Sequence, residues 1–408
     1  MGFGAAAEGT KARYAASQWA PRSARYFRGV SVFRKEGLMK ARARSLDDWL
    51  NEILRLPTAP FHEQQVTGRI KAFARERGLG LKEDRAGNLV LEYRHAARGR
   101  QPVAFCCHTD HPGFEVIAAR GRQATLRLLG GVDEPTLRRS RIRLLGAGGP
   151  VRAEVLAVTM AKDRRKDDTT LRVRVASPVA VGDWGHFDLL PLSLAGGKIR
   201  SKALDNVLSA TLILKLLDDF SAEKRSGHVY GVFTAAEEVG FVGAMELMRS
   251  GLLPRRVPMV VMETSRELPG FKIGAGPVVR VGDRLSVYDD ELTRWLTETA
   301  EALAKQDKHF RFQRALMPGG ACEASLYQLE GRATCALAVA LANYHNMGPR
   351  GAAAEWVSRS DAEQMLQLLT ALTASGPQPG RREALRRLIW KQHRRYAGRF
   401  RRGGRAAA

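Results

Sequence analysis

Residues 229–240 read VYGVFTAAEEVG, and this stretch decides the fold and the chemistry that we expect. Its first five residues form an apolar, β-branched and aromatic run, which is typical of a buried strand. Two adjacent carboxylates, Glu237 and Glu238, follow. Two anions beside a buried strand carry a desolvation cost unless a cation lies between them or one of them holds a proton. A divalent metal would offset that cost, with one glutamate binding it and the other transferring protons; the alternative is two solvated residues at the start of a helix.

Three further apolar runs are followed by side chains that could bind a metal. They are residues 103–107 before His108, residues 259–262 before Glu263, and residues 334–341 before His345. Open α/β sheets bind ligands at the carboxyl ends of their parallel strands, so we expect these side chains to meet at one edge of a sheet. Asp110 lies two residues after His108 and can orient the imidazole ring by accepting a hydrogen bond from it. For His108 alone, a core histidine with a satisfied polar neighbour is the alternative.

The segments between these strands have the periodicity of helices. Apolar residues recur at spacings of three and four over residues 46–54, 66–73, 208–217 and 358–374. Asp205 lies near the start of the third of these helices, where it is either an ordinary N-terminal acid or a ligand that bridges two ions. Strands that alternate with helices predict an α/β fold with a mixed, mostly parallel sheet flanked by helices.

Residues 113–195 interrupt the α/β pattern. Short alternating segments are separated there by Gly, Pro and Asp without a long helical period, which predicts a small all-β domain. The sequence therefore divides into four regions. They are a catalytic domain of residues 45–112 and 196–375, an inserted β domain of residues 113–195, and basic extensions of residues 1–44 and 376–408.

Most of the formal net charge of +24 lies in the two extensions. Residues 1–44 hold ten Lys and Arg against two Glu, and residues 381–408 hold eleven against one, which leaves +6 for the remainder. The composition of residues 1–44 predicts a disordered extension, with an organelle transit peptide or a translation start at Met39 as alternatives. The second extension has an amphipathic stretch that could bind a membrane surface, a nucleic acid or another subunit. Its apolar residues are Leu385, Leu388, Ile389 and Trp390.

The composition also bounds the class of protein. No segment approaches the roughly 20 uninterrupted apolar residues that span a membrane. The four cysteines are too few and too irregularly spaced for a disulfide framework. Buried thiols in a reducing compartment are favoured, and we therefore expect a cytoplasmic protein.

The polar residues beside the strand ends match the requirements of a two-metal site. Such a site needs one carboxylate shared between the metals, one carboxylate and one histidine for each metal, and one free general base. The six residues that fill these places are His108, Asp205, Glu237, Glu238, Glu263 and His345. Imidazole and carboxylate ligands suit two divalent ions, for which we expect zinc, with cobalt or manganese as alternatives.

Over about residues 45–375 the chain resembles the di-zinc aminopeptidases of the glutamyl- and deblocking-aminopeptidase family, also called tetrahedral or cellulase-M-like aminopeptidases. The motifs that carry the resemblance are HTDHPGFEV at 108–116, GGVDEPTL at 130–137, KALDN at 202–206, FTAAEEVG at 233–240, GAGPVV at 274–279 and NYHN at 343–346. The resemblance implies a catalytic domain of the zinc-exopeptidase type. It also implies a PDZ-like β insert that helps to build a homo-oligomer, from a dimer up to a hollow particle of twelve subunits.

The resemblance further implies a role for each site residue. His108 and Glu263 would bind one metal, Glu238 and His345 would bind the other, and Asp205 would bridge the two. Glu237 would be the general base and later the general acid. Asp110 would orient His108.

Three positions depart from the family pattern. Glu263 stands where the family usually has aspartate, and glutamate occurs there in related di-zinc carboxypeptidases and deacylases. His111 stands where the family often has an acid. The segment PGGACEAS at 318–325 replaces a GGTDA-like segment, which brings Cys322 and Glu323 near the expected substrate pocket.

These observations favour a metallo-aminopeptidase that acts on short peptides, with Glu237 as the base that activates water. The first alternative, motivated by Glu263, is a di-zinc deacylase or carboxypeptidase-like amidohydrolase. The second alternative is a non-catalytic scaffold or nucleic-acid-associated protein that uses its Arg-rich ends to contact polyanions.

Overall fold

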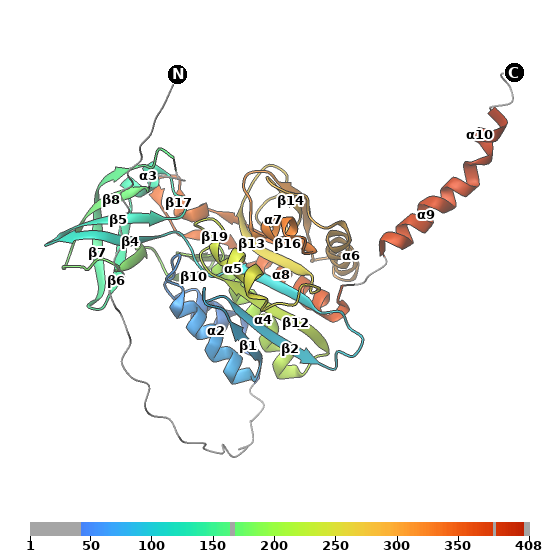
Figure 1. Cartoon of the computed structure of the whole chain (residues 1–408), viewed down its shortest axis with the longest axis horizontal. Coiled ribbons are helices and arrows are strands. Elements are labelled where there is room, and N and C mark those ends of the chain that lie inside the picture. The colour runs from blue at the N-terminus through green and yellow to red at the C-terminus, as the bar shows by residue number, and fades with distance from the viewer. Residues whose placement is uncertain (1–41, 164–167, 378–380, 404–408) are drawn as a thin grey trace, which may run out of the picture. The chain divides into compact units, whose positions relative to one another are not determined.

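The structure is a computed structural model that describes residues 42–163, 168–377 and 381–403. The expectations for residues 1–41 lie outside the described residues. The core of the described chain is a mixed sheet of eleven strands, with helices packed against it and a separate antiparallel barrel inserted after the third strand (Figure 1). This arrangement confirms the predicted fold class.

The central sheet has parallel strands in its middle and antiparallel strands at both sides. The four parallel neighbours are β12 (Gly227–Thr234), β3 (Val103–His108), β13 (Met259–Arg266) and β16 (Thr334–Ala342). The antiparallel strands beside β12 are β2 (Leu89–His95) and β1 (Gly80–Glu83), and those beyond β16 are β19 (Glu355–Ser358), β11 (Lys198–Ser201) and β10 (Leu192–Ala195). Strand β14 (Val278–Asp283) also pairs with β16 and carries β15 (Gln313–Met317) parallel to it. The parallel strands are therefore the ones whose ends carry most of the predicted site residues.

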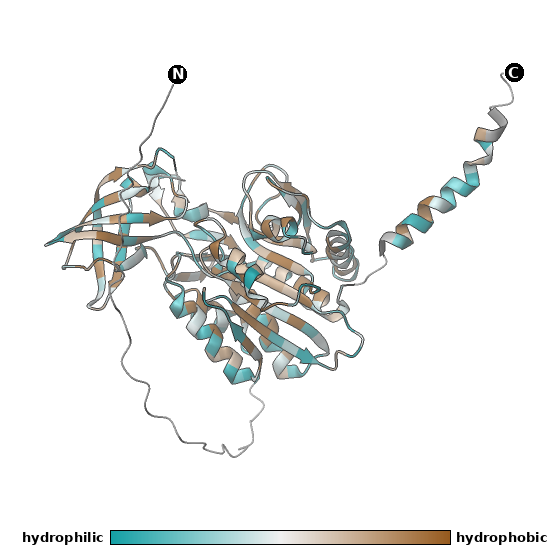
Figure 2. Cartoon of the chain, viewed as in Figure 1, coloured by the Kyte–Doolittle hydropathy of each residue, from teal (hydrophilic) through white to brown (hydrophobic). Residues whose placement is uncertain are grey.

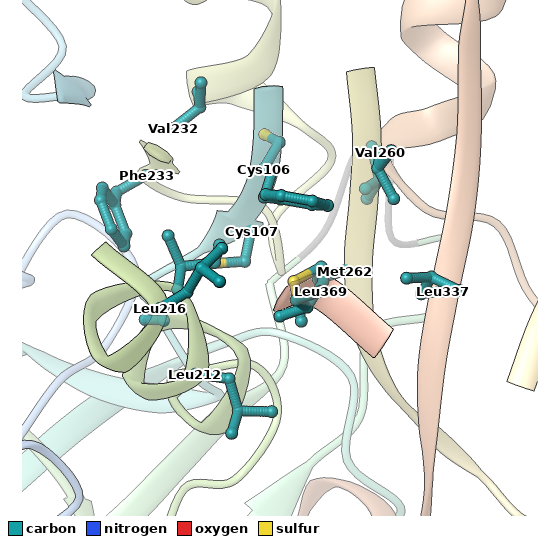
Figure 3. Packing of buried hydrophobic residues seen from close by; sticks show 14 of the residues in the cluster. Cys106, Cys107, Leu212, Leu216, Val232, Phe233, Val260, Met262, Leu337 and Leu369 are labelled. Atoms are coloured by element: carbon teal, nitrogen blue, oxygen red, sulfur yellow. The ribbon is translucent and has the colours of Figure 1, made fainter. Parts of the chain in front are cut away.

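Helices cover both faces of the parallel strands. Every residue of β3 is buried, and successive side chains on a strand point to opposite faces. The Cys106 sulfur lies 3.6 Å from the Tyr327 hydroxyl of α7 (Glu323–Leu329). Cys107 lies beside Leu216 of α4 (Val207–Glu223), as Figure 3 shows. Burial on both faces explains why these strands read as continuous apolar runs rather than alternating ones.

The helix α1 (Leu46–Ile53) connects the start of the described chain to the core. The hydroxyl of Ser45 accepts a hydrogen bond from the backbone N–H of Asp48, and the Asp48 carboxylate accepts one from the Ser45 N–H, which makes a capping box. The buried indole of Trp49 donates to the Asp218 carboxylate of α4 over 3.0 Å. The other helices that pack around the sheet are α2 (Gln64–Arg77), α5 (Val242–Ser250), α6 (Asp290–Gln306) and α8 (Arg359–Ser375).

The inserted domain is a closed, fully antiparallel six-stranded barrel. Its strands, in the order around the barrel, are β4 (Gly113–Arg120), β5 (Gln123–Leu129), β8 (Thr170–Val175), β7 (Gly149–Thr159), β6 (Arg141–Gly146) and β9 (Trp184–Phe187). A short helix, α3 (Glu134–Arg138), follows β5. The barrel has its own core, in which Phe114 and Phe187 pack edge to face. Strand β10 falls inside the predicted insert of residues 113–195 but pairs with β11 in the central sheet.

Two further helices follow α8 in the chain. They are α9 (Arg381–Tyr396) and α10 (Gly398–Gly403). In Figure 2, hydrophilic and hydrophobic residues are interspersed along α9, in contrast to the hydrophobic parallel strands. Within the described ranges, none of the helices has both the length and the apolar character that crossing a bilayer requires.

Candidate metal centre

Five of the predicted site residues line one cavity at the carboxyl ends of the parallel strands, and His345 contacts two of them, Asp205 and Glu238. Strands β12 and β3 pair in register so that Thr234 is opposite His108, and the Glu237–Glu238 pair follows directly after β12. Strand β13 contributes Glu263, and the turn after β16 contributes His345. Asp205 lies just before α4. The cavity is lined by His108, Asp205, Glu237, Glu238, Glu263 and Tyr344, among others.

One group of donor atoms faces His108. Its Nε2 atom lies 3.6 Å from Oδ1 of Asp205, 3.8 Å from Oε2 of Glu263 and 3.9 Å from Oε2 of Glu237. These separations are too long for good hydrogen bonds. Two ligands at about 2.1 Å from a common zinc ion, at a tetrahedral angle, lie about 3.4 Å from each other. The atoms around His108 are therefore spaced like the ligands of one ion.

A second group faces His345. Its Nε2 atom lies 3.0 Å from Oε1 of Glu238 and 3.7 Å from Oδ2 of Asp205. Asp205 thus turns one carboxylate oxygen toward each histidine. A carboxylate in this position has the geometry of a ligand shared between two ions.

The unpaired atoms of the site provide a test of whether metal ions fit. Four of its buried polar atoms lack a hydrogen bond of acceptable geometry, although two of them, His345 Nε2 and Glu238 Oε1, lie 3.0 Å apart, and a buried polar atom without a good hydrogen bond is costly. They are Asp205 Oδ1, Glu238 Oε1, Glu263 Oε1 and His345 Nε2. All four are oxygen or imidazole nitrogen atoms of the kind that divalent ions bind. The potential ligand atoms of the site form two groups of three, and the three atoms of each group lie within 4.8 Å of one another. The residues present fit a pair of divalent cations.

The electrostatics of the metal-free site are those of crowded anions around two imidazoles. Burial raises the pKa of Asp205 to about 7 and the pKa of Glu237 well above its ordinary value. Burial lowers the pKa of both histidines, but the negative charge of the surrounding carboxylates raises it by more. The pKa of His108 lies well above its usual range, with Glu237 as the main cause of the rise, and that of His345 is raised to about 9, with Glu238 as the main cause. The site therefore holds protons at neutral pH that incoming cations must displace.

Three side chains from other segments fix the turn that presents the glutamate pair. Four consecutive backbone N–H groups, those of residues 235–238, each donate to a side chain at 2.9–3.0 Å. The acceptors are Asn88 for Ala235, Glu63 for Ala236, and the two carboxylate oxygens of Asp110 for Glu237 and Glu238. Ala236 has a φ of 50°, a left-handed conformation that an alanine rarely adopts without such support. Asp110 thus holds the backbone of both glutamates.

Asp110 also contacts His108, and its backbone carbonyl lies nearer to the ring than its carboxylate does. The Nδ1 atom of His108 lies 3.2 Å from the Asp110 carbonyl oxygen and 3.4 Å from its carboxylate oxygen Oδ1. These contacts direct Nε2 of His108 into the cavity. On the other side of the site, Nδ1 of His345 donates to the carbonyl of Gly131 over 2.6 Å, which directs its Nε2 inward as well.

Glu355, which was not predicted from the sequence, connects two of the site residues. This carboxylate on β19 is fully buried. Its Oε2 atom accepts from the backbone N–H groups of Leu204 and Asp205 at 2.7 and 3.0 Å, and its Oε1 atom accepts from that of His345 at 2.8 Å. A lone acid inside the apolar segment AAAEWV was the available signal, because a charge in a buried strand implies a specific partner.

His111, which departs from the family pattern, is also part of this supporting layer. Its Nδ1 atom contacts the carbonyl of Asp205 at 2.5 Å, and its Nε2 atom contacts Oδ1 of Asn346 at 3.0 Å. Both ring nitrogens are therefore occupied away from the cavity. Asn206 similarly donates to the carbonyl of Met262 next to Glu263. The supporting layer holds the segments that carry Asp205, Glu263 and His345 together.

Solved structures with the same architecture define the class of fold. A tetrahedral (TET) aminopeptidase from the marine sediment archaeon Thaumarchaeota archaeon SCGC AB-539-E09 superposes with a TM-score of 0.68 at 19% identity, covering 81% of this chain and 96% of that one. The TET1 peptidase of Pyrococcus horikoshii, which can assemble into a tetrahedron or a large octahedral shell, gives a TM-score of 0.67 at 21% identity, covering 81% and 99%. At these identities the similarity shows a shared fold.

The family follows from the sequence. The profile of the M42 glutamyl aminopeptidases matches residues 87–368, so the chain belongs to the M42 glutamyl aminopeptidase family. This family is metal-dependent. A proposed aminopeptidase of Acetivibrio thermocellus is 30% identical over 122 residues, which are 26% of this chain and 33% of that protein. The proposed aminopeptidase SgcX of Escherichia coli K12 is 24% identical over 228 residues, 50% of this chain and 59% of that protein, so the matches span less than two thirds of either relative.

Proposed function

We propose that this protein is a metal-dependent aminopeptidase that removes N-terminal residues from short peptides. The observation that carries the proposal is the position of Asp205, whose two carboxylate oxygens face the two histidines inside a cluster of glutamates. Membership of the M42 family supports the same reaction. The cavity is open to solvent beside the cluster, which lets a peptide reach it.

Five residues would hold the metals. His108 and Glu263 would bind one ion, Glu238 and His345 the other, and Asp205 would bind both. We propose zinc as the native metal, since the ligands are imidazoles and carboxylates at spacings that suit tetrahedral ions. When bound, such ions polarise a carbonyl oxygen and lower the pKa of water. The buried partners of the ligands, Asp110 and Glu355 among them, keep these side chains in place.

Glu237 is the proposed proton-transfer residue. Its carboxylate is the most exposed of the cluster, at 12% of the side chain compared with 5–7% for Asp205, Glu238 and Glu263. It can therefore reach both the attacking water and the leaving group. In the proposed reaction its carboxylate takes a proton from the attacking water and returns it to the nitrogen of the leaving amine.

The spacing of Glu237 also permits a different role. One ligand atom from each of Glu237, His108 and Glu263 forms a group within 4.8 Å, so Glu237 could bind a metal instead. The variant Glu237→Gln distinguishes the two roles. If Glu237 is the general base, the variant retains both metals and its kcat falls by about 100-fold to 10,000-fold. If Glu237 is a metal ligand, the variant binds less metal.

Arg280 suggests which N-terminal residue the cavity accepts. This β14 side chain is only 3% exposed, its Nε atom has no hydrogen-bond partner, and it lines the same cavity as Glu263. In the part of the chain that the structure describes, it forms no ion pair within 4.0 Å. Its guanidinium carbon lies 5.9 Å from the centre of the Tyr288 ring, but a buried cation without a paired anion is unfavourable unless a ligand supplies one. We therefore propose a preference for peptides whose N-terminal side chain is a carboxylate.

The same arginine also keeps a second reaction open. A di-zinc deacylase would use Arg280 to bind the free carboxylate of an N-acyl amino acid, and Glu263 is the observation that favours it. Hydrolysis of aminoacyl anilides, with Asp, Glu, Leu and Lys as the first residue, can be compared with hydrolysis of N-acetyl and N-formyl amino acids. We expect turnover of the acidic anilides. Turnover confined to the N-acyl compounds would refute the aminopeptidase proposal.

We also propose that the protein is a cytoplasmic homo-oligomer. All four cysteines are buried and free, which suits a reducing compartment. The TET1 peptidase of Pyrococcus horikoshii, which shares the fold of this chain and can assemble into a tetrahedron or a large octahedral shell, supports a homo-oligomer. Light scattering coupled to gel filtration measures the subunit number, and a monomeric particle would contradict this proposal.

A further inference from the structure

The helix α9 carries an uncovered apolar stripe. Leu385, Leu388, Ile389 and Tyr396 are spaced so that they share one face of a helix at 3.6 residues per turn. Their exposed fractions are 37%, 60%, 60% and 44%. Four exposed apolar side chains on one face of a helix are typical of a surface that contacts an apolar partner.

The opposite face of the same helix is basic. Arg386, Arg387, Lys391, Arg394 and Arg395 are all exposed, and on a helical wheel they fall outside the apolar stripe. The only acid from 381 to 403 is Glu383, which contacts Arg386 and Arg387. The remaining cations have no intrahelical acid to neutralise them. The helix therefore presents two separate features that need a partner, an apolar stripe and a strong positive charge.

Three kinds of partner can be compared by these two features. A nucleic acid would neutralise the cations but would leave Leu388 and Ile389 in water. A second copy of the helix would cover the stripe but would bring two strongly basic segments together, and like charges repel. A bilayer surface with anionic phospholipids satisfies both, because the stripe enters the acyl boundary and the cations meet phosphate and carboxylate headgroups.

We infer that α9 is an interfacial helix that binds the protein to membranes containing anionic phospholipids. The apolar stripe would face the acyl chains, and the five cations would lie at the level of the headgroups. On the helical wheel Trp390, 47% exposed, falls between Arg386 and Arg394 and outside the stripe, so its amphipathic ring would lie at the level of the headgroups. Phe400 of α10, 82% exposed, would add a second apolar contact. The protein would lie on the membrane without spanning it.

The test uses the full-length protein and two sets of variants. Vesicles of phosphatidylcholine, with and without phosphatidylserine, are sedimented with the protein, and the bound fraction is measured. We expect binding to the phosphatidylserine vesicles that weakens as the salt concentration rises. The stripe variant Leu388→Gln/Ile389→Gln and the charge variant Arg386→Gln/Arg387→Gln/Arg394→Gln should each lower the partition coefficient about tenfold or more.

Matched controls lie on the catalytic domain and the barrel. The control for the stripe is Leu329→Gln, since Leu329 is 70% exposed, and the control for the charge is Arg94→Gln/Arg98→Gln/Arg120→Gln, since all three arginines are exposed. Both controls should bind vesicles like the wild type. Peptide hydrolysis should be equal in all variants.

Three outcomes would overturn the inference. The first is vesicle binding that is the same in the stripe variant as in the wild type. The second is tight binding of duplex RNA or DNA together with no binding of vesicles, which would make the helix a nucleic-acid contact. The third is a change of subunit number in the stripe variant, measured by sedimentation velocity without vesicles, together with no binding of vesicles by the wild type.

Discussion

The carboxylate of Glu355 accepts a hydrogen bond from the backbone N–H of His345, and its second oxygen accepts from that of Asp205. One buried side chain thus holds a histidine from the turn after β16 and an aspartate from the segment before α4. These two residues are 140 positions apart in the sequence. Their relative position in the proposed metal centre depends on Glu355.

We predict that Glu355→Gln weakens metal binding. Glutamine replaces one acceptor oxygen by an amide NH₂ group, which faces N–H donors and cannot accept from them. Loss of such a supporting contact lowers metal affinity by about 10-fold to 100-fold. Zinc affinity is measured by competition with a chromophoric chelator. The control is Glu363→Gln on α8, since Glu363 is exposed and pairs with Arg359; equal affinities in the two variants would contradict the proposed role of Glu355.

The pKa values of the metal-free site predict that metal binding releases protons. The pKa of Asp205 is raised to about 7, that of His345 to about 9, and that of His108 well above its usual range, so these groups hold protons at neutral pH. Metal ligands must be deprotonated, so apparent affinity should rise as the pH increases from 6 toward 9. Calorimetric titrations of zinc in buffers with different ionisation enthalpies count the protons. A titration without proton release at pH 7 would show that these ligands are not the binding groups.

Arg280→Met should change specificity without harming the fold. A hydrogen bond to a charged group contributes about 1.5–3 kcal/mol, so kcat/KM for substrates with N-terminal Glu should fall by about 10-fold to 100-fold while that for Leu stays the same or rises. Because Arg280 forms no ion pair within 4.0 Å among the described residues and its guanidinium contacts the Tyr288 ring at 5.9 Å, methionine should change the free energy of unfolding little. Arg280→Lys keeps the charge and should retain part of the preference. A uniform loss across all substrates would mean that Arg280 does not select the side chain.

Asp218 should be a determinant of stability far from the site. It is fully buried, forms an ion pair with Arg77 at 2.5 Å, and accepts from the Trp49 indole and the Arg44 N–H. Asp218→Asn removes the negative charge of this buried ion pair and should lower the free energy of unfolding by about 3 kcal/mol, as measured by urea denaturation. The exposed pair of Glu154 and Arg174 provides the control, and Glu154→Gln should have no measurable effect.

The sequence could predict those features that depend on local pattern. The apolar runs that end near His108, Glu237, Glu263 and His345 located the strands, and the rule for parallel sheets brought their ends to one edge. The change of periodicity at Gly113 located the β insert. All seven predicted site residues lie around one cavity or support it directly.

The supporting contacts could not be predicted in the same way. Glu355 contacts His345 and Asp205 because β19 lies next to β16 and β11, and strand order is a property of the whole chain rather than of any segment. Arg280 lies in β14, where all residues but one are buried, and its lack of an ion pair depends on which residues surround it in three dimensions. Neither fact is visible in spacing or composition.

The central claim is that two cations lie on either side of Asp205. Its most direct test is a crystal structure of the zinc-loaded protein with anomalous diffraction recorded at the zinc edge, together with elemental analysis of the same sample. The account predicts two zinc ions per chain, one beside His108 and Glu263 and one beside Glu238 and His345, each within ligand distance of one Asp205 oxygen. A single ion, or two ions of which neither contacts Asp205, would contradict it.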